Sequence, residues 1–231
     1  SFARLVYISA WLKCHYPAAF TCALLNSQPM GFYAPSQLVR DARDHGVELR
    51  PVSVNHSQWD CTLEPRTDGQ LALRLGFRQI KGLREEDAIW IAAARGNGYP
   101  DIDSLWRRAG VHPNALERLA EADAFATLGL SRRDALWEVR ALRAPDPLPL
   151  FDVGGEGVIE PEVTLPAMTL GQEVLEDYLS LRLSLRAHPL ELLRPELHES
   201  LPHERLPEAK GRVTVTGLVI TRQRPGTASG V

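Results

Sequence analysis

The chain has 231 residues, of which 24% are charged and 44% hydrophobic, and its formal net charge is −3. This is the composition of an ordinary globular protein, so it excludes a polycation that binds nucleic acid over its whole surface. Its three cysteines, Cys14, Cys22 and Cys61, form no CxxC pair, and their odd number argues against a disulfide framework. We therefore expect no metal site and a reducing, cytoplasmic compartment.

The N-terminal segment is apolar but interrupted. Arg4, Lys13 and Pro17 break the run before it is long enough to cross a bilayer, so we expect no membrane association. The chain has neither an initiator Met nor a signal-peptide layout, and we expect Ser1 to lie inside a longer protein. The pattern predicts a mostly buried helix over 2–16 and a second helix that begins after Pro17 and ends near Asn26.

Two residues of the first predicted helix are candidates for contact with a nucleotide or template. Lys13 and Tyr16 recur at helical spacing on one side of the segment. The alternative is a packing helix whose cations are simply solvated. The next segment predicts a helix over 35–45 that Gly46 ends.

A small β element is predicted next. Strand-like runs cover 47–52, 61–63 and 71–75, and a turn signal at 67–69 separates the last two.

A nine-residue stretch then occurs twice, 47 residues apart. It begins at Gly82 and again at Gly129, and each copy repeats Gly, Leu, Asp, Ala and Trp in register, ending at Trp90 and Trp137. A turn glycine that leads into a helix is typical of the helix-hairpin-helix unit. Glycine allows backbone angles that expose amide groups, and the start of a helix favours an anion. The repeat therefore predicts a site for DNA phosphates, which positions a duplex without reading its sequence.

The predicted DNA-binding residues follow from this reasoning. They are Lys81, Gly82, Leu83 and Arg84 in the first hairpin, and Gly129, Leu130, Ser131, Arg132 and Arg133 in the second. Arg132 and Arg133 are followed by a single acid, whereas three acids follow Arg84, so we expect the second hairpin to make the stronger contact. Two alternatives stay open: hairpins that only pack within a protein-interaction module, and a DNA glycosylase, which needs a catalytic Lys or Asp after the hairpin.

Residues 100–103 imitate a catalytic carboxylate motif. Two-metal phosphoryl transfer needs clustered carboxylates, but the spacing of Asp101 and Asp103 does not continue, since position 105 is Leu. We instead interpret Asp103 and Ser104 as the cap of a helix over 105–108.

The rest of the chain changes character after the second hairpin. Helices are predicted over 113–122 and 132–142. An acidic segment rich in Pro and Gly, without Lys or Arg, then predicts a linker over 144–169. Helices over 170–185 and 189–198 and a strand over 213–222 follow.

Longer strings resemble the fingers region and hairpins of the bacterial replicative DNA polymerase alpha subunit, the C family. These strings are Ala10 to Phe20, Ile80 to Leu83, and Leu119 to Gly129. Others resemble its error-prone branch: Leu24 to Tyr33, Val54 to Cys61, Leu183 to Leu190, and Gly217 to Val219. The resemblance covers nearly the whole chain.

This resemblance implies a mainly α fold with a small β element. The implied organisation is a fingers segment (1–75), tandem helix-hairpin-helix units (76–143), the linker (144–169), a helical tether (170–206) and the start of a truncated OB fold (207–231). The implied function is part of an error-prone, damage-tolerant DNA-directed DNA polymerase that grips primer–template duplex and single-stranded template. The parent enzyme would use Mg²⁺ and dNTPs. This chain would lack the palm carboxylates, bind no cofactor and be inactive alone.

The resemblance also implies protein partners. Pro147 to Phe151 occupies the place of a sliding-clamp-binding peptide, but Pro147 replaces its anchoring Gln, so we expect weak or absent clamp binding. A mutagenesis accessory protein is the partner expected for the error-prone branch.

Overall fold

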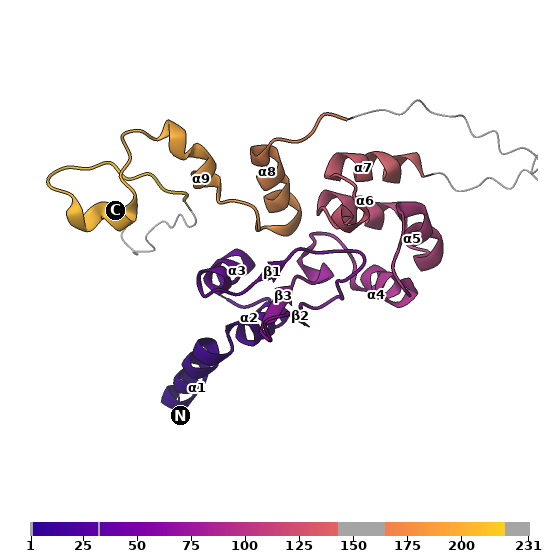
Figure 1. The fold of residues 1–231 in the computed structure, drawn as a ribbon, viewed down its shortest axis with the longest axis horizontal. Helices are drawn as coiled ribbons and strands as arrows, with labels where there is room; N and C mark the ends of the chain where they lie inside the picture. Colours follow the sequence, from indigo (N-terminus) through magenta and orange to yellow (C-terminus); the bar gives the residue numbers. More distant parts are fainter. Residues whose placement is uncertain (1, 32, 143–164, 220–231) are drawn as a thin grey trace, which may run out of the picture. The chain divides into compact units, whose positions relative to one another are not determined.

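The computed structural model describes residues 2–31, 33–142 and 165–219 (Figure 1). These residues belong to two compact units, Ser1–Leu185 and Arg186–Val231. The described part is mainly helical and contains one small mixed sheet, which confirms the predicted fold class.

Three helices open the first unit: α1 (Phe2–His15), α2 (Pro17–Asn26) and α3 (Pro35–Asp44). Pro17 and Pro35 lie at helix starts, where the missing N–H of proline costs nothing. α2 buries Cys22 and Leu25 against α3 and the sheet. The helices predicted for this region are therefore confirmed, and Gly46 follows α3 in the left-handed conformation.

The prediction that the first helix is mostly buried is wrong. α1 has no buried residue, and Phe2 is 82% exposed. A helix that is apolar all round needs partners on every side. Within the described chain α1 packs mainly on α2 and adds one ion pair from Lys13 to α3, and Figure 1 shows it extending away from the rest of the unit.

The sheet has the order β1-β3-β2, with β1 (Leu49–Arg50), β2 (Thr62–Pro65) and β3 (Leu71–Arg74). β3 is central, parallel to β1 and antiparallel to β2. The predicted β element is confirmed, although its first strand has two residues rather than six. Pro51 follows at once and has no N–H to continue the ladder.

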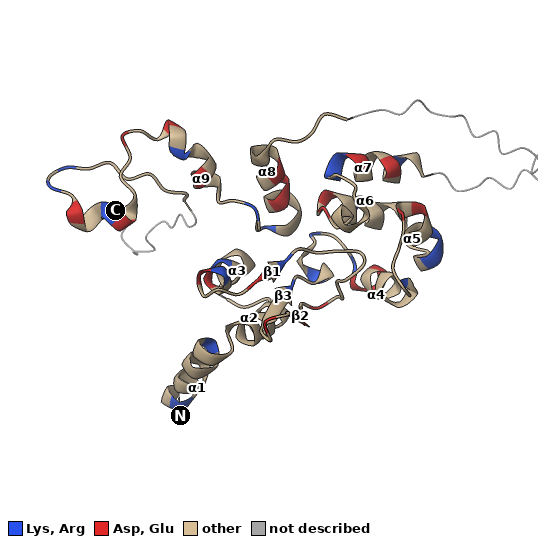
Figure 2. Ribbon diagram, viewed as in Figure 1, with Lys and Arg blue, Asp and Glu red and all other residues tan. Residues whose placement is uncertain are grey.

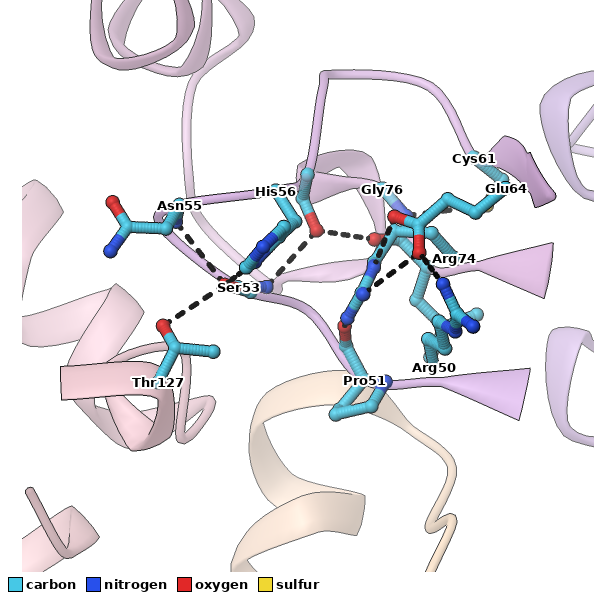
Figure 3. Close-up of polar contacts among 12 residues, drawn as sticks. Arg50, Pro51, Ser53, Asn55, His56, Cys61, Glu64, Arg74, Gly76 and Thr127 are labelled. Carbon is cyan, nitrogen blue, oxygen red and sulfur yellow. Dashed lines mark hydrogen bonds and ion pairs between the residues drawn. The ribbon is translucent and has the colours of Figure 1, made fainter. Parts of the chain in front are cut away.

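An ion-paired cluster covers one end of this sheet (Figure 3). Glu64 accepts hydrogen bonds from Arg74, at 2.8 and 3.0 Å, and from Arg50. These bonds, those from Arg74 foremost, lower the pKa of Glu64 to about 2.

The loop of residues 53–57 joins the sheet to the helices that follow. Val54 N donates to Ala124 O at 3.0 Å, and the hydroxyls of Ser53 and Thr127 are 3.1 Å apart (Figure 3). Asn55 pairs through its side-chain amide with both backbone groups of Tyr99. Ser57 Oγ donates to Leu75 O at 2.7 Å, which fixes the loop to the end of β3.

Arg95 inserts into this loop from the end of α4. Its guanidinium is buried and donates to the carbonyl oxygens of Val54 and Ser57. Burial lowers its pKa from the ordinary arginine value. A buried charge is tolerated only where hydrogen bonds replace water, and the two carbonyls do that here.

Four helices surround the second part of the core: α4 (Glu85–Ala94), α5 (Ile102–Ala109), α6 (Pro113–Glu121) and α7 (Arg132–Ala141). Short 3₁₀ turns, η1 (Phe77–Gln79) and η2 (Ala126–Leu128), precede α4 and α7. The fully buried side chains of Ile91, Leu105, Leu116, Leu119 and Phe125 hold these helices together. The helices predicted around both hairpins are confirmed.

α8 (Leu170–Leu181) also belongs to the first unit and packs against α6. Thr169 and Gln172 form a capping box at its start. The helix ends four residues earlier than predicted because Arg182 adopts the left-handed conformation.

The second unit contains α9 (Pro189–Leu193), η3 (Arg194–Glu196) and η4 (His203–Glu208). The strand predicted over 213–222 is wrong for its described part. Within residues 213–219 only Thr214 pairs with another segment, in an isolated bridge to Ser200. A strand needs a continuous ladder of backbone hydrogen bonds to a neighbouring strand, and the described residues provide no such neighbour here. The rest of that strand and the predicted clamp peptide lie outside the described residues, and the OB fold and the domain boundaries stay predictions.

The Arg95 contact predicts a measurable loss of stability. We expect Arg95→Met to lower the free energy of unfolding by about 3 kcal/mol, because two buried carbonyls lose their donor. Urea unfolding followed by circular dichroism measures this. Arg40→Met is the control, since Arg40 is 69% exposed and pairs weakly with Asp44, and its change should stay within about 0.5 kcal/mol. Equal losses in both variants would contradict the prediction.

The pKa of Glu64 predicts a pH dependence. A carboxylate whose folded pKa is lowered from 4.5 to about 2 stabilises the fold above pH 4.5, and this contribution is lost as the pH falls towards 2. We expect Glu64→Gln to lower Tm at pH 7, and the difference from the unsubstituted chain to shrink below pH 4.5. A difference in Tm that does not change with pH would argue against this role. Asp44→Asn is the exposed control.

Candidate nucleic-acid interface

The two hairpins have the same backbone geometry. Gly82 and Gly129 have φ values of 81° and 78°, which favour glycine, and each lies three residues before the first residue of its helix. The small residues Ala88 and Ala135 are buried in both copies, whereas Trp90 and Trp137 are 57% and 52% exposed. The internal repeat in the sequence is therefore a repeat of structure.

The repeated aspartates hold the helix starts. Arg84 donates to both carboxylate oxygens of Asp87 at 2.9 Å. In the second copy Ser131 Oγ donates to Asp134 at 2.5 Å and accepts from its backbone amide. Both aspartates thus stabilise the first turn of a helix. A glycosylase would need an Asp or Lys after the hairpin that is free for catalysis, so this structural role does not favour the glycosylase alternative.

The first hairpin presents cations to solvent. Lys81 and Arg84 are exposed, and Leu83 is buried beneath them. Arg118 of α6, which the sequence reasoning missed, lies over the hairpin, since a Cβ at Gly82 would be 3.4 Å from its Nε. The first turn of α4 adds Glu85, Glu86 and Asp87, so cations and anions alternate around this hairpin.

The second hairpin differs from the expectation at Arg132. The side chain of Arg132 is 1% exposed and donates to Asp177 of α8 at 2.5 Å, and Glu173 Oε2 lies 3.3 Å away. It contributes to the packing of α8 and has no access to a phosphate in this conformation. Arg132 therefore gives no support to the ranking of the second hairpin above the first.

The other predicted residues of the second hairpin lie nearer the surface. Gly129 and Ser131 are exposed, and Leu130 is half-buried. Arg133 is half-buried, and its Nη1 donates to Pro166 O at 2.6 Å. Figure 2 shows the alternation of charges along the helices, including the acidic residues of α8.

Lys13 and Tyr16 lie far along the chain from both hairpins. Lys13 forms a 2.8 Å ion pair with Asp41 of α3. Tyr16 is exposed, and its ring packs against that of Trp11. Lys13 is therefore not simply solvated, and contact of Lys13 and Tyr16 with a nucleotide or template stays a prediction.

The residues that imitate a catalytic motif cap and pair within α5. Asp101, rather than Asp103 or Ser104, is the N-cap, and its carboxylate accepts from Ser104 N at 2.7 Å. Hydrogen bonding from Ser104, by its side chain first and then by its backbone amide, lowers the pKa of Asp101. Asp103 pairs with Arg107. Across residues 2–31, 33–142 and 165–219, no three His, Cys, Asp or Glu side chains gather as a metal site would require, so these residues do not fit the two-metal centre of a polymerase.

No helix in the described part of the chain is both long and apolar enough to span a membrane.

Comparison with known proteins identifies the relatives. The helix-hairpin-helix motif family matches residues 46–135, a range that includes the sheet and both hairpins. The whole chain is 70% identical to part of the error-prone DNA polymerase of Ruegeria pomeroyi. It is 49% identical to part of error-prone DNA polymerase 1 of Rhizobium meliloti and 50% to part of the error-prone DNA polymerase of Mesorhizobium japonicum. The chain covers 21% to 23% of these proteins, and the resemblance seen in the sequence is confirmed.

The burial of Arg132 predicts that its substitution acts through stability. We expect Arg132→Ala to lower the free energy of unfolding by roughly 3–5 kcal/mol, because it removes the guanidinium from a buried carboxylate. Arg133→Ala is the neighbouring control and should cost less than about 1 kcal/mol. Thermal and urea unfolding measure both variants.

A double substitution tests whether the unpaired buried carboxylate causes the loss of stability in Arg132→Ala. Arg132→Met combined with Asp177→Leu replaces the ion pair by apolar contact and should recover at least half of the loss. Equal stability of Arg132→Ala and Arg133→Ala would show that the ion pair does not support the fold.

Proposed function

Because the chain is homologous over its whole length to a segment of error-prone DNA polymerases, we propose that it holds DNA by its phosphates within such an enzyme. The observation that carries the proposal is the repeated hairpin, in which a left-handed glycine precedes a helix start twice with the same spacing. The first-turn amides of a helix have no partner inside the helix and favour an anion. Two such sites grip a backbone without reading bases.

The first hairpin is the stronger contact in this proposal. Lys81 is exposed and makes no ion pair with the described residues, and Arg118 lies beside Gly82. In the second hairpin the contact depends on backbone amides near Gly129 and on Arg133, whose guanidinium has further donors besides the one bound to Pro166.

The activity of the parent polymerase is part of the proposal. It would be DNA-directed DNA synthesis across damaged templates in the cytoplasm, with Mg²⁺ and dNTPs as metal and substrates. Since the described residues offer no carboxylate cluster, no step of nucleotidyl transfer is assigned to them, and we expect the chain alone to be inactive. A mutagenesis accessory protein, rather than direct binding of the sliding clamp, is the proposed partner.

A second candidate is a hairpin module that only packs against protein. The burial of Arg132 and the three acids in the first turn of α4 favour it, because both reduce the positive potential near the hairpins. Salt-dependent DNA binding separates the two candidates.

The proposal predicts salt-sensitive binding of a primer–template duplex. We expect log affinity to fall linearly with log salt concentration, measured by fluorescence anisotropy of labelled DNA. Lys81→Ala should reduce the slope by about 0.9, the value for one lost phosphate contact. Arg107→Ala is the matched control, since Arg107 is exposed on α5 and pairs with Asp103, and it should leave the slope unchanged.

Absence of binding, or binding that salt does not weaken, would support the packing module instead.

A further inference from the structure

Arg182 stands where a glycine is favoured. It ends α8 with φ 62° and ψ 14°, and its amide donates to Tyr178 O at 3.1 Å. α5 ends in nearly the same conformation, with φ 62° and ψ 24°, but there the residue is Gly110. A side chain in the left-handed region costs conformational free energy, so the backbone alone would favour glycine at position 182.

The backbone on both sides of Arg182 is fixed, and its side chain is exposed. Leu181 and Leu183 are buried on either side of it. The carbonyl of Ser180, two residues earlier, accepts a 2.8 Å hydrogen bond from the backbone amide of Lys81. The end of α8 is therefore attached to the first hairpin, and the arginine follows within two residues of that attachment.

The cations near the first hairpin have few acidic partners. Lys81 and Arg182 are exposed and form no ion pair with the described residues. Arg118, beside Gly82, pairs with Glu121 through Nη1 at 2.8 Å and keeps its other donors. Lys81 and Arg118 thus lie at the first hairpin, and Arg182 follows two residues after Ser180, which is bonded to that hairpin. We call these three residues the first-hairpin cluster.

We propose that Arg182 binds a DNA backbone phosphate at the first hairpin, completing a site with Lys81 and Arg118. The proposal rests on the function proposed above and adds a residue from outside the hairpin repeat. α8 then has two roles: its acidic side holds Arg132 of the second hairpin, and its last turn brings a cation to the first. A planar guanidinium suits a phosphate because it can donate two parallel hydrogen bonds.

Arg182→Gly tests the proposal, because it should move stability and DNA binding in opposite directions. Removal of the left-handed side chain should raise Tm by about 2 °C. Loss of one phosphate contact should weaken duplex binding about fivefold at low salt and reduce the salt slope by about 0.9. Arg182→Lys keeps the charge and should retain most of the slope, and Arg107→Ala is the control for loss of a surface charge on another helix.

The measurement is anisotropy of the full 231-residue chain with a labelled primer–template duplex over a salt series, with Lys81→Ala in parallel. A shallower slope for Arg182→Gly supports the assignment. An unchanged slope for Arg182→Gly, while Lys81→Ala reduces it, overturns the assignment and leaves the proposed function intact. If the unsubstituted chain shows no salt-dependent binding, the proposed function fails and the role of Arg182 fails with it.

Discussion

The fold of the first unit depends on one buried cation in a loop. Arg95 leaves the end of α4 and donates to two carbonyls of the 53–57 loop, which in turn is bonded to β3, to Tyr99 and to the turn before the second hairpin. These hydrogen bonds therefore connect the sheet, α4 and the turn before the second hairpin at one loop. A charge removed from water is costly, so this arrangement is stable only while both carbonyls are in place.

Some charged side chains of this protein are buried and contribute to its packing. Arg95, Arg74 and Arg132 are all buried, and each is held by oxygen atoms of the protein. A net charge of −3 leaves few cations for a polyanion, and those that face solvent near the first hairpin come from several elements. A count of basic residues within a motif consequently overestimates the number that a ligand can reach.

Elements with local sequence signals could be predicted from the sequence alone. Pro17, Gly46, Gly82 and Gly129 define helix boundaries through their own backbone preferences, and the hairpin repeat was visible as a repeat of letters. The β element could be found because alternation and a turn signal lie next to each other. Relatives of 49% to 70% identity bear out the family resemblance that the longer strings indicated.

What could not be predicted depends on contacts distant in sequence. The burial of Arg132 requires Asp177, 45 residues later, and no periodicity links the two. Residues 2–15 have the composition of a core helix, yet within the described chain they pack mainly on α2 and stay exposed. The left-handed turn at Arg182 carries no glycine signal, and Arg118 reaches the hairpin only through the packing of α6. Each of these features is a property of the assembled unit rather than of a segment.

The contacts of Ser53 and Val54 have a mechanical consequence. They fix the turn before the second hairpin to the loop that also receives Arg95 from the helix after the first hairpin, so the distance between the two hairpins cannot change without breaking buried hydrogen bonds. If the two hairpins bind phosphates as proposed, a fixed distance between them would select for the spacing of the phosphates and not for the chemistry of the bases. Under the proposed function, a template with an oxidised or alkylated base would be held like an intact one. A crosslink or a bulge that alters the helical rise would be the kind of damage that such a protein detects.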